Sequence, residues 1–249
     1  MKNKHLVLLL LAVAFAPFLT TSTLGQVEPA KIAIVPSQPR LSNDDASEVP
    51  QAVVLTVHGR CDYSEDGTTF SAFKAGQVFK QGALVRTADG ARADLFFRRI
   101  GTTVRLQSGT EVKLEKLERH MKDGVPVMDT LLELRTGRIF TVVRSLIPGC
   151  TLEIRNAAGR SIVEGGGGKG RYIITADGTH VTEKDSAVPL KIIRENGVTV
   201  IEPGMTFNAK EGKMFALEPT AAVQMLIEFD ELDAVAETEA SSGNLQTPK

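Results

Sequence analysis

The sequence lacks tryptophan, has only two tyrosines, and carries a net charge of −1. Sites that bind nucleic acids or sugars usually stack ligand rings on exposed aromatic side chains. This composition therefore argues against nucleic acid and, more weakly, against sugars. The balanced charge also gives no reason to expect binding to nucleic acid or to an anionic membrane surface. Nucleic acid is therefore not an expected partner.

A long apolar run is missing as well, and this absence bears on membrane insertion. Residues 6–19 form an apolar stretch of 14 residues, whereas a membrane-spanning helix needs about 20. Lys2 and Lys4 precede this stretch, and small polar residues follow it up to Gln26. This pattern predicts a secretory signal peptide over residues 1–25, cleaved before Gln26, and hence a periplasmic or secreted mature chain. An uncleaved anchor is the alternative.

Cysteine is scarce, with only Cys61 and Cys150 in the chain. In an oxidising compartment two cysteines permit one disulfide, which is the alternative that we favour. The other alternative is two separate thiols that pack as small apolar residues. The sequence does not give the Cα separation on which the choice depends.

Short segments with a period of two dominate the chain. Ala91, Ala93, Leu95 and Phe97 fall on one face of such a segment, and Gly or Asp-Gly turns recur about every ten residues. This pattern predicts an all-β fold, either a two-sheet sandwich or roll of many short strands or, as the alternative, a short β-helix. The expected strands are 52–57, 68–73, 77–85, 91–97, 103–106, 111–117, 129–135, 138–144, 151–155, 160–164, 171–176, 179–182, 190–195, 198–201, 205–209 and 213–217.

The segments on either side of the β domain (52–217) have a different character. Residues 26–51 contain four prolines and a polar run, which predicts a linker. Residues 218–249 begin with helical spacing after Pro219, which suits the first turn of a helix. The later part of this segment is acidic, which is unfavourable at the negative end of a helix dipole. We therefore expect a short C-terminal helix that frays into an acidic disordered tail.

The turn and core positions of the β domain resemble the FecR domain family. The resemblance covers roughly residues 52–207. Because its motifs are mostly turn and core positions, it implies a fold rather than an activity. The residues that carry it are Phe73, Ala75, Gly76, Val78, Gly82, 84–87, Gly90, Ala91, Ala93, Leu95, 104–106, 108–112, Leu134, 137–139, Ile154, Ala157, Gly159, 162–165 and 179–182.

Several of these positions have a clear local role. Gly76, Gly82, Gly90, Gly137 and Gly165 fall at turns between strands, where glycine tolerates a positive φ.

Arg86 and Thr87 fall at the end of an expected strand. A threonine there can bond to backbone groups of a turn, and we interpret the arginine as one member of a surface ion pair.

The chain also departs from the family. Members that regulate sigma factors carry a cytosolic segment and a membrane span before the β domain, whereas this chain begins with an apparent signal peptide. The family's usual Arg-Gly-Thr step appears here as Glu164-Gly165 followed by a glycine-rich insert. A partner-contact role is therefore not carried over to this turn.

The glycine-rich insert contains a GxGxxG spacing at 165–170. A dinucleotide site needs such a loop to open a helix, and here a strand follows, so we interpret the insert as a turn. Lys169 and Arg171 beside it are candidate contacts for an anion or a partner. The histidines are far apart, and no nucleophile motif is present, so we expect no metal, no cofactor and no catalytic residues.

These observations favour an exported, non-catalytic module of a bacterial cell envelope that binds or scaffolds an envelope protein or a glycan. The first alternative is a periplasmic signalling relative that relays an outer-membrane receptor signal to a separate membrane regulator, with its acidic C-terminal arm as the docking segment. The second alternative is a hydrolase with an unrecognised site.

Overall fold

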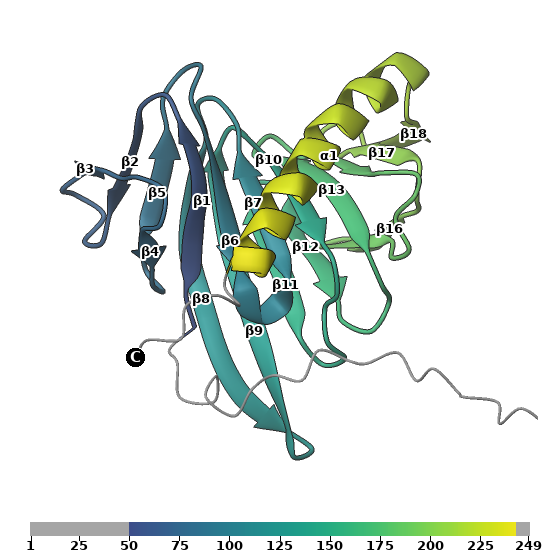
Figure 1. Cartoon of the computed structure of the whole chain (residues 1–249). Coiled ribbons are helices and arrows are strands. Elements are labelled where there is room, and N and C mark those ends of the chain that lie inside the picture. The colour runs from purple at the N-terminus through teal and green to yellow at the C-terminus, as the bar shows by residue number, and fades with distance from the viewer. Residues whose placement is uncertain (1–49, 243–249) are drawn as a thin grey trace, which may run out of the picture. The chain divides into compact units, whose positions relative to one another are not determined.

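The short alternating segments form two nine-stranded sheets, A and B, and one helix follows them (Figure 1). The protein is represented by a computed structural model that describes residues 50–242. The prediction of an all-β fold with two large sheets and a C-terminal helix is confirmed. The predicted signal peptide, nearly all of the linker and the end of the tail lie outside the described residues.

Sheet A has the strand order β18-β17-β14-β13-β10-β7-β6-β1-β4. A single 3₁₀ turn, Arg98–Ile100, separates β6 from β7. The strands in chain order are β1 Ala52–His58, β4 Val78–Phe79, β6 Arg92–Phe97, β7 Thr102–Leu106, β10 Arg138–Val143, β13 Gly170–Thr175, β14 Thr179–Thr182, β17 Met205–Asn208 and β18 Lys213–Ala216.

Sheet B has the order β16-β15-β12-β11-β9-β8-β5-β2-β3. Strands β9 and β11 pair in parallel, with Thr151 beside Asp129. The strands in chain order are β2 Cys61–Ser64, β3 Ser71–Ala72, β5 Leu84–Thr87, β8 Glu111–Lys122, β9 Val125–Thr136, β11 Thr151–Asn156, β12 Gly159–Glu164, β15 Leu190–Arg194 and β16 Gly197–Ile201.

From β6 onward the chain adds strands to the two sheets in turn, and both sheets grow in the same direction. Gly137 lies at one crossing between sheets, at a φ of 77°. A Cβ there would come within 2.4 Å of the Thr110 hydroxyl, so any side chain would displace the turn. Gly165 lies at another crossing, where a Cβ would come within 1.9 Å of the Ile147 carbonyl oxygen. The crossings therefore require glycine because backbone passes close to backbone.

The core lies between the sheets and takes side chains from both. Leu95 and Val104 from sheet A pack in the same cluster as Leu114 and Leu132 from sheet B, and each is at most 1% exposed. Each buried side chain of this size contributes roughly 1.5–3 kcal/mol. The alternation that predicted the strands is therefore the alternation between core and outer face.

Several parts of the β domain differ from the predicted strands. The predicted strand 68–73 is only β3 (Ser71–Ala72), and the predicted strand 77–85 is divided by the turn at Gly82 into β4 of sheet A and β5 of sheet B. Strand β2 (Cys61–Ser64) was missed, because only five residues separate Arg60, at the end of one turn, from Asp66 in the next turn. Strands β8 and β9 extend well beyond the predicted 111–117 and 129–135, up to a tight turn at Asp123-Gly124. Both turn residues have positive φ, as a two-residue hairpin requires.

Helix α1 (Pro219–Ser242) lies across the outer face of sheet A (Figure 1). Phe229 and Leu232 are fully buried against Phe140, Ile173 and other apolar side chains of the sheet. The expectation that the helix frays where it becomes acidic was wrong, because the acidic segment stays helical through Ser242. No helix among residues 50–242 combines the length and apolar character needed to cross a membrane.

Candidate functional site

The acidic residues of α1 contact cations on the outer face of sheet A. Arg105 of β7 forms a bidentate ion pair with Asp94 of β6, in which Nε and one terminal nitrogen donate to the two carboxylate oxygens at 2.8 Å and 3.1 Å. Its remaining terminal nitrogen donates to Glu228 and Glu231 of the helix, at 2.9 Å and 3.2 Å. The Arg105 side chain is 2% exposed. This arginine therefore joins the helix to the sheet while satisfying a buried carboxylate.

A second ionic cluster lies further along the helix. Asp233 accepts from Lys169 at 2.7 Å and from Arg171 at 2.6 Å, and Arg171 also donates to Asp230 at 2.8 Å. Arg144 donates to the Asp233 carbonyl oxygen. Lys169 and Arg171, the candidate contacts for an anion or partner, thus bind carboxylates of the chain's own helix.

The charges in these clusters stabilise one another. Burial alone would raise the pKa of Asp233, but the hydrogen bonds and charges of Lys169 and Arg171 lower it below its usual range. Burial alone would lower the pKa of Arg105, but Asp94 and Glu228 raise it. These contacts therefore favour the charged forms of Asp233 and Arg105, and the acidic arm is engaged within the molecule.

The outer face of sheet B is open along most of its strands. It carries rows of opposite charges, such as Arg135 with Glu133 at 3.2 Å and Lys191 with Glu164 at 2.5 Å. These side chains are 29–58% exposed. Such exposed pairs keep the face soluble and contribute little stability.

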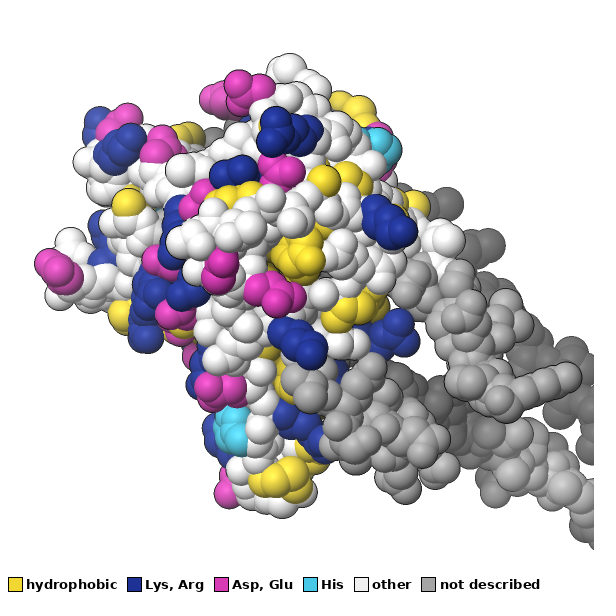
Figure 2. Space-filling view, turned by 90° about the vertical axis from the view of Figure 1, so that its left-hand side faces the viewer, with side chains coloured by type: hydrophobic (Ala, Val, Ile, Leu, Met, Phe, Trp, Pro, Cys, Tyr) yellow, Lys and Arg dark blue, Asp and Glu magenta, His cyan; other side chains and the backbone are white. Residues whose placement is uncertain are grey.

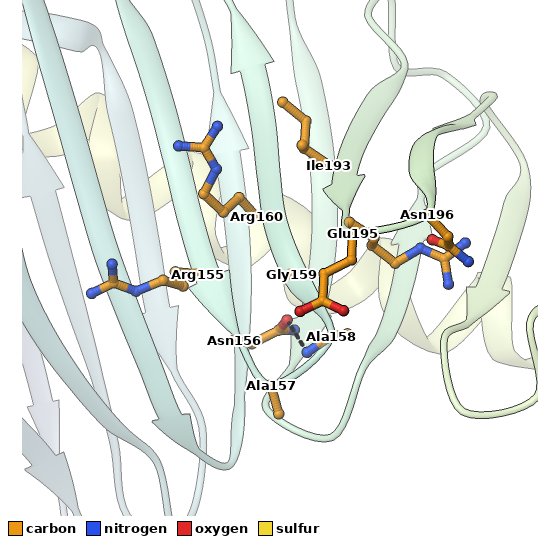
Figure 3. A pocket seen from close by; sticks show the side chains of 10 residues that line it. Arg155, Asn156, Ala157, Ala158, Gly159, Arg160, Ile193, Glu195 and Asn196 are labelled. Atoms are coloured by element: carbon orange, nitrogen blue, oxygen red, sulfur yellow. Dashed lines mark hydrogen bonds between the residues drawn. The ribbon is translucent and has the colours of Figure 1, made fainter.

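A groove of about 720 Å³ lies at the end of this face, where the β11–β12 and β15–β16 turns meet (Figure 3). Arg155 and Arg160 extend from neighbouring strands on one side, and Glu195 extends toward the β11–β12 turn. The Asn156 side chain holds that turn by accepting from the Ala158 N–H at 2.9 Å. The residues that line the groove are Arg155, Asn156, Ala157, Ala158, Gly159, Arg160, Ile193, Arg194, Glu195 and Asn196.

The arginines of the groove have N–H donors that could bind an anion. Arg155 lies 3.8 Å from Glu115 and 3.9 Å from Glu133, and Arg160 lies 3.5 Å from Glu153. Each guanidinium carries five N–H donors, so such long contacts leave donors available. The two side chains are 41% and 49% exposed. Arg194 also lines the groove, but its guanidinium donates to the Thr199 hydroxyl at 3.0 Å and stacks over the Phe207 ring. Arg155 and Arg160 therefore suit a carboxylate or phosphate group beside an apolar contact at Ile193.

The opposite end of the molecule, near β2 and β3, shows small groups of hydrophobic side chains among charged ones (Figure 2). The tip of the β8–β9 hairpin lies at the bottom of that view. Met121 and Val125 at the tip are 62% and 48% exposed. A smaller hollow of about 420 Å³ lies between residues 53–56 of β1, the Ala75-Gly76 turn and the end of α1.

The two cysteines do not form the disulfide that we favoured. Both are buried free thiols. Cys61 lies on β2, while the Cys150 sulfur accepts from the Met128 N–H of β9 at 3.2 Å. Cys150 directly precedes β11, and β5, β8 and β9 lie between β2 and β11, so the two positions are four strand spacings apart, about 19 Å. A disulfide needs Cα atoms within about 7 Å.

The motif positions from the family resemblance lie where turns and ion pairs are needed. Gly76, Gly82 and Gly90 lie in turns with positive φ. Arg86 lies 3.6 Å from Asp62 and stacks its guanidinium over a phenylalanine ring, consistent with a surface role.

Thr87 bonds to the facing turn rather than to its own. Its hydroxyl donates to the Gln107 carbonyl oxygen at 2.5 Å and accepts from the Thr110 N–H at 3.0 Å.

His180 is the fully buried histidine of β14. Its Nδ1 lies 3.1 Å from the Gly178 carbonyl oxygen and therefore donates, and Nε2 accepts from the Asn156 side chain at 3.2 Å. Burial lowers the pKa of His180 to about 4, so it is neutral at pH 7. Within residues 50–242, no group of three or more His, Cys, Asp or Glu side chains is placed to hold a metal ion.

Sequence reasoning missed Arg105 and the three groove arginines. Arg105 stood between two core residues, so alternation placed it on an outer face without indicating that a helix covers that face. The usable signal was the pair Glu228 and Glu231, which are three residues apart and so lie on one side of a helix. Arg155 and Arg160 flank one turn, but the sequence does not indicate that the pairing of β12 with β15 places Ile193 and Arg194 beside them.

Comparisons with family models, with curated proteins and with solved structures gave no match to this chain. The assignment of function therefore depends on the geometry of the chain itself.

Proposed function

We propose that this chain is an exported, non-catalytic module of a bacterial cell envelope that binds an anionic partner at the arginine-lined groove of sheet B. The observation that carries the proposal is the pair Arg155 and Arg160, whose partly exposed guanidinium groups extend from neighbouring strands on one side of this concave surface. The FecR resemblance and the apparent signal peptide supply the envelope setting. The partner is an envelope protein or a glycan that presents carboxylate or phosphate groups.

The groove lacks the parts that hydrolysis needs. Its one carboxylate, Glu195, has no second acid in the lining to share acid–base work, and no serine, cysteine or histidine lines it. Binding is therefore the role that the groove supports best.

The alternative signalling role required the acidic arm as a docking segment. Asp230 and Asp233 are engaged by Arg171 and Lys169, and Glu228 and Glu231 by Arg105. An arm whose carboxylates are paired within the molecule has little charge to offer a second protein. The groove is therefore the better candidate for partner contact.

A photo-crosslinking amino acid in place of Ile193, in the groove, tests the proposal in intact cells. The matched control replaces Val223, which is 61% exposed on the outward side of α1. We expect a specific adduct from position 193 and none from 223, and mass spectrometry of the adduct separates a polypeptide from a glycan. We also expect Arg155→Glu with Arg160→Glu to remove the adduct, because both changes replace attraction to an anion by repulsion. Equal adducts at 193 and 223, or no change with the glutamates, would contradict the proposal.

A further inference from the structure

Strand β16 (Gly197–Ile201) is an unusually open sheet edge. It is the last strand of sheet B, and none of the described residues pairs with its outer side. Proteins usually protect edges by shortness, charge or proline. The edge strands β3 and β4 have only two residues each, and the edge strand β18 begins with Lys213. Strand β16 has five residues, no charge and no proline.

The register of the β15–β16 hairpin shows which backbone groups of β16 point outward. Arg194 pairs with Gly197 across a two-residue turn, and Ile192 pairs with Thr199. In a two-residue hairpin the flanking pair is hydrogen-bonded, and such pairs alternate with non-bonded ones. Gly197, Thr199 and Ile201 therefore bond to β15. The N–H and C=O groups of Val198 and Val200 point to the open edge.

We infer that two copies of this chain associate through β16, in antiparallel pairing about Thr199, so that their B sheets join. With Thr199 opposite its counterpart, Val198 of each copy lies opposite Val200 of the other. The outward groups of these valines then form four backbone hydrogen bonds. One strand supplies both halves of the contact, which is the condition for a two-fold interface.

The side chains beside this edge favour a second copy. Val198 and Val200 are 62% and 39% exposed, and cross-strand pairs of β-branched residues are favourable. The neighbouring cation, Lys191, is paired with Glu164 at 2.5 Å, so like charges do not confront each other across the two-fold axis. The strand contact alone is smaller than the roughly 1,000 Å² of a stable interface, so the dimer is weak and concentration-dependent.

Sedimentation velocity of the mature chain from about 1 μM to about 1 mM tests the inference. We expect a monomer at the low end and a growing dimer fraction at the high end. Val198→Lys with Val200→Lys places like charges opposite each other and weakens association at least about tenfold. Circular dichroism checks that this variant folds. A wild-type chain that stays monomeric throughout overturns the inference, as does a dimer that the lysines leave unchanged.

A cysteine crosslink tests the register independently of affinity. In the inferred dimer Thr199 faces its counterpart in a non-hydrogen-bonded pair, with Cα atoms about 4.5 Å apart, within reach of a disulfide. We expect Thr199→Cys to form a disulfide-linked dimer under mild oxidation. Val223→Cys, on the exposed side of α1, is the control for random collision. Equal crosslinking of both variants overturns the inferred register. Because neither experiment involves Arg155 or Arg160, the inference can fail while the groove proposal stands, and the reverse.

Discussion

Arg105 and Arg155 are both outward-facing arginines on strands, one on each sheet, yet their surroundings differ sharply. Arg105 is 2% exposed beneath α1 and is held by three carboxylates. Arg155 is 41% exposed and has two contacts near 4 Å. On the outer face of sheet A the charged side chains bind α1, whereas on the outer face of sheet B they remain exposed to solvent. This difference is why we place partner binding on sheet B.

Removal of each arginine in turn tests whether the two faces differ in this way. Arg105→Met should destabilise the fold by about 3–5 kcal/mol, because Asp94 would be left buried with only the Thr56 hydroxyl as a nearby partner. Arg155→Met should change stability by less than about 1 kcal/mol, because exposed ion pairs are screened by water and salt. Urea unfolding of both variants measures the difference. Similar losses would show that the two faces are not distinct.

The apolar half of the helix contact allows a second, sharper test. Phe229→Ala should cost about 3 kcal/mol, because the ring is fully buried with its centroid 5.3 Å from that of Phe140. The matched control is Val223→Ala on the same helix, where 61% exposure predicts a change within about 0.5 kcal/mol. Thermal or urea unfolding measures both. A near-neutral Phe229→Ala would mean that the ionic clusters alone hold the helix.

Much of the fold, but little of the site, could be predicted from the sequence. Alternation in segments such as Arg92–Phe97 and Thr102–Leu106 fixes which residues face the core, and Gly turns fix where strands end. Alternation does not indicate what covers the other face. The acidic helix end was therefore predicted to fray, although its carboxylates meet Lys169, Arg144 and Arg171.

The groove was beyond sequence reasoning for a related reason. Arg155 and Arg160 flank one turn, but Arg194 joins them only because β12 pairs with β15. The disulfide was mispredicted on similar grounds, since sequence gives cysteine identity without the order of strands in the sheet. Local patterns thus define the elements, and the pairing order of the elements defines the site.

The pH of these experiments matters because His180 is buried in its neutral form. The folded-state pKa is about 4, below the unfolded value near 6.5, so protons favour the unfolded chain as the pH falls between these values. Stability is fully present above pH 7, and about 2 kcal/mol should be lost between pH 7 and pH 5. His180→Gln should remove this slope, measured as the unfolding free energy at both pH values. An unchanged slope would show that other groups cause it. The two faces should therefore be compared above pH 7.

The smallest expected effect concerns the thiols, and it tests whether a covalent link ties the strands of sheet B together. Burial, with a smaller effect of Asp62, raises the pKa of Cys61 to about 11, and burial raises that of Cys150. Both thiols should therefore resist alkylation at pH 8 until the chain unfolds. A reducing agent should leave the unfolding free energy within about 0.5 kcal/mol, whereas a disulfide closing the chain between these positions would be worth about 4–5 kcal/mol. A larger loss on reduction would mean that the open face is held by a covalent link. The small effect of Arg155→Met on stability would then result from that covalent link and not from the exposure of the charges on sheet B.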